Sequence, residues 1–213
     1  MELNRFLESV KDEVLFETSL LFAGTERPQQ AQRQVADWVR AGQVVQLRRG
    51  LYALAEPNAQ AKPHPFVVGN SLVPASYISI HMALSYYSLI PEHVAVVTSV
   101  TTQRPGQWQT PYGRFAFQHV QRDFFYGFEY RAVSQTQYAY VALPEKALLD
   151  LVYIRPGGDK PAFLASLRLQ NLDQLNVERL LVFADRLGKQ KLKQAAQFIA
   201  HLVREELEGY QVL

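Results

Sequence analysis

The chain has 213 residues, enough for one large domain or two small ones, and it contains no cysteine. The absence of cysteine excludes a disulfide framework and a thiolate metal site, and it fits a reducing cytoplasm. The formal net charge of +2 favours no class of partner, and no apolar run approaches the length of a transmembrane helix. Acidic residues interrupt every candidate signal-peptide core near the start, so we expect a cytoplasmic protein.

Three short helices are expected within the first 42 residues. Apolar residues at helical spacing predict the first, namely Leu3, Phe6, Leu7 and Val10. Thr18 suits the N-cap of a second helix over 18–23. Thr25 is a possible N-cap and Pro28 fits the first turn of the third helix, which Gly42 ends in a left-handed conformation. The apolar stripe of this third helix predicts its core-facing side and consists of Ala31, Val35, Trp38 and Val39.

Two β-prone runs follow, over 44–47 and 51–54, and Arg48, Arg49 and Gly50 join them. This pattern predicts a tight hairpin with two arginines at its tip. Three helices and a hairpin in this order are typical of a winged helix-turn-helix domain, which we expect over residues 1–57. In such a domain the third helix enters the major groove of DNA.

Charge is segregated in the same part of the chain. Residues 1–26 carry two basic and six acidic side chains, a balance of −4, whereas residues 27–49 carry five arginines and one aspartate, a balance of +4. The positive charge therefore lies on the predicted reading helix and hairpin, where phosphates would be.

The polar face of the third helix distinguishes a DNA reader from a scaffold. Opposite the apolar stripe it carries Gln29, Gln30, Arg33, Asp37 and Arg40. Glutamine and arginine form two-pronged hydrogen bonds with adenine and guanine edges. The alternative is an ordinary solvated face, since both residue types are good exposed helix formers. With the hairpin attached, we predict DNA contacts from Gln29, Gln30, Arg33, Arg40, Arg48 and Arg49.

A polar, proline-punctuated stretch over 58–65 is expected to be an extended linker. The remaining residues, 66–213, predict a larger α+β domain with a small sheet and helices grouped mainly after it. β-branched and alternating patterns predict strands over 94–100, 115–120, 124–132 and 138–142. Helical spacing predicts helices over 76–87, 144–151, 161–169, 177–187 and 189–208.

Polar groups in this domain have two interpretations each. Glu145 suits the positive end of its helix, and Lys146 and Asp150 are expected as an i,i+4 pair on the helix surface, with an acid–base set as the alternative. A hydroxyl-rich strand end is expected at a solvated sheet edge, or else in contact with a partner, and consists of Thr98, Ser99, Thr101 and Thr102. The aromatic run 124–128 is expected in the core, with stacking on single-stranded bases as the alternative. A basic cluster could give phosphate contacts or keep a turn soluble, and consists of Arg186, Lys189, Lys191 and Lys193.

Four short motifs follow one another at a specific spacing. They are Leu-Arg-Arg-Gly-Leu-Tyr at 47–52, Ser-Tyr-Ile-Ser at 76–79 with Ala83-Leu84, Thr98-Ser99 with Arg104, and Leu-Pro-Glu-Lys-Ala-Leu-Leu-Asp at 143–150. Their order resembles the AbiEi family, the antitoxins of type IV toxin–antitoxin systems, over most of the chain to about residue 200. The resemblance implies a winged helix that represses its own promoter, and a larger domain that counteracts a nucleotidyltransferase-like toxin without necessarily forming a stable complex. It also implies that Arg48, Arg49 and the preceding helix contact DNA.

Enzymatic motifs are missing from the sequence. A polymerase-type nucleotidyltransferase needs a Gly-Ser turn before two carboxylates one residue apart, and the only acids so spaced, Glu206 and Glu208, lack that turn. There is no phosphate-binding Gly-x-x-x-x-Gly-Lys and no Gly-x-Ser-x-Gly nucleophile turn. We therefore expect a non-enzymatic protein without metal or cofactor. The alternative function is a ligand-responsive winged-helix transcription factor with a sensing C-terminal domain.

Overall fold

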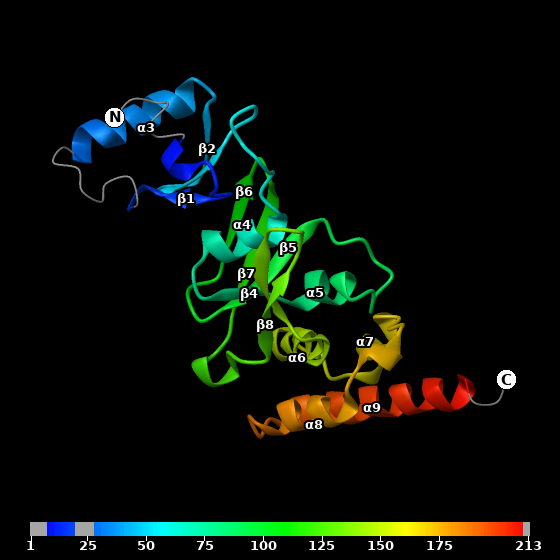
Figure 1. Ribbon diagram of the computed structural model, residues 1–213. Helices are drawn as coiled ribbons and strands as arrows, with labels where there is room; N and C mark the ends of the chain where they lie inside the picture. Colours follow the sequence, from blue (N-terminus) through cyan, green and yellow to red (C-terminus); the bar gives the residue numbers. More distant parts are fainter. Residues whose placement is uncertain (1–7, 20–27, 211–213) are drawn as a thin grey trace.

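The computed structural model describes residues 8–19 and 28–210, which form two β-sheets surrounded by helices (Figure 1). The first sheet has the strand order β1-β3-β2, with β1 (Phe16–Glu17), β2 (Val44–Arg48) and β3 (Leu51–Leu54). The second has the order β6-β7-β5-β4-β9-β8, with β4 (Ser76–Ile78), β5 (Val96–Thr101), β6 (Gly106–Thr110), β7 (Gly113–His119), β8 (Phe128–Ala132) and β9 (Tyr138–Ala142). The expectation of an α+β fold is confirmed, although the second sheet is larger than expected.

The N-terminal unit, residues 8–19 and 28–54, is built on helix α3 (Pro28–Arg40). Its apolar stripe packs Val35 and Trp38 into a small core with residues of the three-stranded sheet, where the Phe16 and Tyr52 rings stack with centroids 5.9 Å apart. Gly42 has a φ of +70°, as predicted for the residue that ends the helix. Of the two earlier predicted helices, residues 8–10 and 18–19 are helical and the rest, with Thr25, lies outside the described residues.

The hairpin of β2 and β3 contributes to two cores. Tyr52 belongs to the small core under α3, whereas Leu47, Leu51 and Ala53 belong to the main core of the C-terminal part, residues 65–210. Successive side chains of a strand point to opposite faces, so a strand buried on both faces can join two layers. The hairpin therefore connects the N-terminal unit to the rest of the molecule.

The connection between the two parts is held by side chains. Gln137 donates a hydrogen bond of 3.0 Å from Nε2 to the Lys62 carbonyl oxygen and accepts one of 2.7 Å from the backbone N–H of His64. Helix α4 (Pro65–Leu72), which was not predicted, begins directly afterwards with proline in its first turn. The His64 ring caps it by accepting a hydrogen bond from the backbone N–H of Phe66. The predicted linker thus ends in a helix N-cap.

The predicted helix over 76–87 is wrong in its first half. Residues Ser76–Ile78 form β4, which lies between β5 and β9, and only then does helix α5 (Ile80–Tyr86) begin. A short apolar run fits either a strand or a helix by spacing alone, and here sheet pairing on both sides decides for the strand. Similarly, the strand predicted over 124–132 is shortened to β8, because Arg122–Phe124 form a 3-10 turn.

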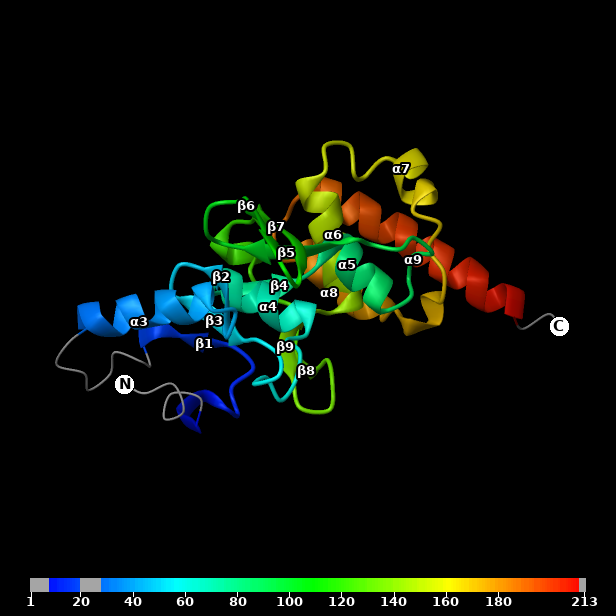
Figure 2. The ribbon, with the colours of Figure 1, turned by 90° about the horizontal axis from the view of Figure 1, so that it is seen from above.

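Helices cover the larger sheet and then stack on one another. They are α6 (Pro144–Ile154), α7 (Pro161–Ser166), α8 (Val177–Asp185) and α9 (Gln190–Tyr210), with a 3-10 turn at Leu172–Gln174. Helix α6 packs against α5, α8 and α9. The apolar stripe of α9 is buried in the main core. Figure 1 places the N-terminal unit and helices α8 and α9 at opposite ends of the molecule, and Figure 2 shows α9 extending away from the N-terminal unit.

Candidate functional site

Helix α3 presents its polar face to solvent. The four predicted DNA contacts on this helix are all exposed: Gln29, Gln30, Arg33 and Arg40. Arg40 forms an ion pair with Asp37 across one helical turn, and both side chains remain mostly exposed, at 78% and 62%. Such an exposed pair is weak, so it leaves the Arg40 guanidinium available to a stronger anion. Ala36 is also exposed on this face, where its small side chain permits close approach of a partner.

The two arginines of the hairpin differ in their surroundings. Arg49 is exposed at the turn, beside Gly50 with its φ of +85°. Arg48 instead turns toward the protein: its Nη2 donates hydrogen bonds of 3.2 Å to Glu17 Oε1 and 3.2 Å to the carbonyl oxygen of Ser71. The expectation of two arginines at the tip therefore holds for Arg49 and is wrong for Arg48, because the Arg48 guanidinium links the hairpin to β1 and α4. The DNA contact predicted for Arg48 stays a prediction.

A buried polar network replaces the surface pair predicted on α6. Lys146 and Asp150 form an ion pair with both side chains fully buried. Lys146 Nζ also donates a hydrogen bond of 2.8 Å to the Tyr77 hydroxyl, and it lies 3.8 Å from the centroid of the Phe124 ring. Asp150 Oδ2 accepts hydrogen bonds of 2.7 Å from Ser79 Oγ and 3.0 Å from the Tyr77 hydroxyl.

Burial determines the electrostatics of this network. It lowers the pKa of Lys146 and raises the pKa of Asp150, while the charge of each partner opposes the shift of the other. Removal from water also raises the pKa of the Tyr77 hydroxyl well above its ordinary value, and the neighbouring Asp150 charge adds to the rise. The network has no contact with solvent and joins α6 to β4, so its geometry suits a structural role.

A second buried acid lies at the start of α6. Glu145 is fully buried on its side chain and accepts hydrogen bonds of 2.9 Å and 3.1 Å from Arg179 of α8, and one of 2.7 Å from the backbone N–H of Asn176. Glu145 lies in the first turn of its helix, as predicted, but its carboxylate also holds α8 in place.

The hydroxyl-rich strand end is not a sheet edge. Strand β5 lies between β4 and β7, and Ser99 and Thr101 are buried. Thr101 Oγ1 donates a hydrogen bond of 3.0 Å to the carbonyl oxygen of Ala75, and Thr98 Oγ1 donates one of 2.7 Å to that of Ser79. The Thr98 and Thr101 hydroxyls therefore bind backbone carbonyl oxygens beside β4, and the expectation of a solvated sheet edge is wrong for this strand.

The predicted basic cluster is dispersed among separate partners. Lys193 pairs with Asp185, the Arg186 guanidinium lies 3.9 Å from the centroid of the Tyr126 ring, and Lys189 Nζ lies 5.0 Å from that of Tyr153. These contacts belong to packing around the α8–α9 turn, which neither stated interpretation, phosphate contact or a turn kept soluble, included.

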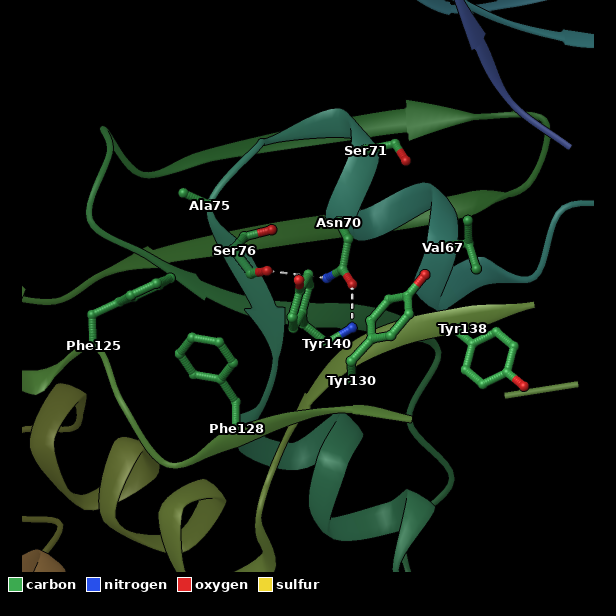
Figure 3. Close-up of a pocket in the computed structure, with 10 residues that line it drawn as sticks. All are labelled: Val67, Asn70, Ser71, Ala75, Ser76, Phe125, Phe128, Tyr130, Tyr138 and Tyr140. Carbon is green, nitrogen blue, oxygen red and sulfur yellow. Dashed lines mark hydrogen bonds between the residues drawn. The ribbon is translucent and has the colours of Figure 1, made fainter. Parts of the chain in front are cut away.

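An aromatic pocket of about 520 Å³ opens between α4 and the β8–β9 ribbon (Figure 3). Its wall contains the side chains of Val67, Asn70, Ser71, Ala75, Ser76, Phe125, Phe128, Tyr130, Tyr138 and Tyr140. Phe125 and Phe128 come from the aromatic run predicted to be core; they are half-buried, and only Phe124 of the run is fully buried. The sequence offered one signal for this pocket, since tyrosines alternate along 138–140.

Within the described ranges, no helix combines the length and apolar character needed to cross a membrane, and no group of three or more His, Cys, Asp or Glu side chains could hold a metal ion. Comparison with known proteins gave no matching family model and no match among curated proteins.

Proposed function

We propose that the protein binds double-stranded DNA in the manner of a winged helix. In this proposal α3 lies in the major groove and the Arg49 end of the hairpin contacts the adjoining backbone. The observation that carries the proposal is the orientation of α3: Val35 and Trp38 fix its apolar side in the small core, so Gln30 and Arg33 point into solvent. Glutamine and arginine side chains exposed on one face of a helix are suited to reading base edges in the major groove.

The test of this proposal is a gel-shift titration with the duplex that lies upstream of the gene. We expect saturable binding to this duplex at low salt and weaker binding to a scrambled duplex of equal length. Because phosphate contacts release counterions, affinity should fall steeply as salt rises. Equal affinity for both duplexes would mean that binding is purely electrostatic, and it would contradict the proposal that α3 recognises a base sequence.

We further propose that the protein is an autoregulating antitoxin, with a nucleotidyltransferase-like toxin as its functional partner. The support is the resemblance of four motifs to the AbiEi family. Two of these motifs meet in space, since Tyr77 and Ser79 of one contact Lys146 and Asp150 of the other. Because these motif residues are buried, their role is structural. An antitoxic surface would therefore consist of exposed residues elsewhere.

Co-expression with the adjacent gene tests the antitoxin proposal. The neighbour is expected to encode a Gly-Ser turn followed by paired aspartates, to arrest growth when expressed alone, and to be tolerated when this protein is present. Arrest that persists in the presence of this protein would contradict the proposal. The DNA-binding proposal would be unaffected, since it depends on a different surface.

The aromatic pocket favours a second candidate, a ligand-responsive regulator. Helix α4 supplies Val67, Asn70 and Ser71 to the pocket wall, and the carbonyl oxygen of the same Ser71 accepts the hydrogen bond from Arg48 of the hairpin. A ligand that shifts α4 would therefore act on the attachment of the DNA-binding unit. A change in DNA affinity upon addition of a pocket ligand would favour this candidate, and the neighbouring gene would then be expected to be metabolic.

A further inference from the structure

We infer that the pocket between α4 and the β8–β9 ribbon binds an uncharged, planar heteroaromatic ring, with the chemistry of a nucleobase in a free nucleoside. This inference names the ligand class for the pocket on which the ligand-responsive candidate rests, and it does not depend on DNA binding or on a toxin. It rests on the arrangement of three tyrosines, on hydrogen-bonding groups beside them, and on the absence of charge from the pocket wall.

The three tyrosines share one face of the β8–β9 ribbon. Tyr130 lies opposite Tyr140 in the antiparallel register, and Tyr138 lies opposite Ala132, so all three side chains point to the same side. Their rings form one aromatic cluster: the Tyr130 ring is stacked on that of Tyr138, with centroids 5.4 Å apart, and is tilted by 46° to that of Tyr140, with centroids 5.0 Å apart. Tyr130 is 62% exposed, Tyr138 is 47% exposed and Tyr140 is 45% exposed. An aromatic cluster with this much exposed surface is suited to stacking on a flat ligand.

Hydrogen-bonding groups lie beside the rings, as Figure 3 shows. Asn70 Oδ1 accepts a hydrogen bond of 2.6 Å from the backbone N–H of Tyr140, and its Nδ2 donates one of 3.3 Å to the carbonyl oxygen of Ser76. These bonds fix the amide in place and leave the second hydrogen of Nδ2 for a ligand. The Ser76 hydroxyl is buried in the pocket wall without a hydrogen-bond partner, so a polar ligand edge could satisfy it.

The pocket wall is uncharged. None of its ten lining residues is acidic or basic, which disfavours phosphates, carboxylates and amines, since each would lose water without gaining a counter-charge. The volume of about 520 Å³ lies in the range of small-molecule pockets. A flat ring with polar edge atoms and no charge matches all three features. Nucleobases have this chemistry, and a free nucleoside carries one without a phosphate.

Isothermal titration of the full-length protein with adenosine, guanosine, cytidine and uridine tests this inference. At least one nucleoside is expected to bind saturably, whereas ribose alone should not bind. Tyr130→Ala together with Tyr140→Ala should weaken binding tenfold or more, because both removed rings belong to the aromatic cluster. Tyr140→Phe should retain most of the affinity, since the stacking surface remains.

The control variant is Tyr86→Ala, which removes a tyrosine that is 42% exposed and lies outside the pocket wall. It should bind the nucleoside as the unmodified protein does, and circular dichroism should show all variants folded. The inference is overturned if none of the four nucleosides binds, if ribose binds equally well, or if the double tyrosine variant binds unchanged. Binding of a single-stranded RNA octamer without binding of any nucleoside would also overturn it.

Discussion

Arg48 of the hairpin and Ser71 of helix α4 are joined by a hydrogen bond of 3.2 Å from the guanidinium Nη2 to the backbone carbonyl oxygen. This contact links the N-terminal unit to the part of the molecule that contains the pocket. Next to Arg48 in the hairpin, Leu47 and Leu51 are buried in the main core. The hairpin therefore belongs to the proposed DNA-binding unit and also attaches this unit to the C-terminal part.

Arg48→Ala is predicted to destabilise the protein, and Arg49→Ala is not. Loss of the Arg48 hydrogen bonds to Ser71 and Glu17 should lower the free energy of unfolding by about 1 to 3 kcal/mol. The exposed Arg49 should change it by about 0.5 kcal/mol or less. Urea unfolding of both variants measures the difference. Equal stability of the two variants would contradict the linking role of Arg48.

Lys146→Met is predicted to be strongly destabilising, because it leaves the Asp150 carboxylate buried without its counter-charge. Breaking one partner of a buried ion pair costs about 3 to 5 kcal/mol. Adding Asp150→Asn should recover part of this loss, since the amide carries no charge and still accepts hydrogen bonds from Ser79 and Tyr77. Thermal or urea unfolding of the single and double variants provides the measurement. A double variant less stable than Lys146→Met would refute charge burial as the cause.

Stability is predicted to fall on acidification, in part through His64. Burial lowers the pKa of His64 below its ordinary value of 6.5, so the unfolded chain binds the proton more tightly than the folded chain. The contribution of this residue to stability is therefore complete above pH 6.5 and is lost as the pH falls from there through the folded-state pKa. Protonation also removes the Nδ1 acceptor that caps α4.

His64→Asn provides the matching control, because asparagine is a good N-cap and does not titrate. The variant should lose less stability than the unmodified protein between about pH 7.5 and pH 5.5, as followed by urea unfolding. His81, whose pKa burial also lowers, should retain its share of the dependence in both proteins. Identical pH profiles would show that His64 does not contribute.

The sequence predicted α3, both hairpin strands and most of the later helices, because each carries its own periodicity and end signals. Strand β9 matched its predicted range of 138–142. Prediction failed where distant pairing decides the outcome. β4 could not be distinguished from a helix until its neighbours in the sheet were known, and β6 was not predicted at all.

The ion pair on α6 shows the same limit at a site. Spacing alone placed Lys146 and Asp150 on one helix face, and the structure agrees with this spacing. What spacing could not reveal is that this face is also buried. The sequence did carry a signal for this burial. Apart from its three charged residues, α6 has apolar side chains on all sides, and such a helix is usually buried. The inward turn of Arg48 had no such signal, since Glu17 and Ser71 come from distant parts of the chain.

We propose that the polar face of α3 and the exposed Arg49 of the hairpin form one surface for duplex DNA. The most direct test is fluorescence anisotropy on the upstream duplex and a scrambled duplex, at several salt concentrations, for the unmodified protein, Arg49→Ala and Arg33→Ala. Arg49→Ala should weaken binding to both duplexes and reduce the slope of log affinity against log salt concentration by about 1. Arg33→Ala should weaken binding to the upstream duplex more than binding to the scrambled one. Variants that bind as the unmodified protein does, or an unmodified protein that does not bind its upstream DNA at low salt, would contradict the claim.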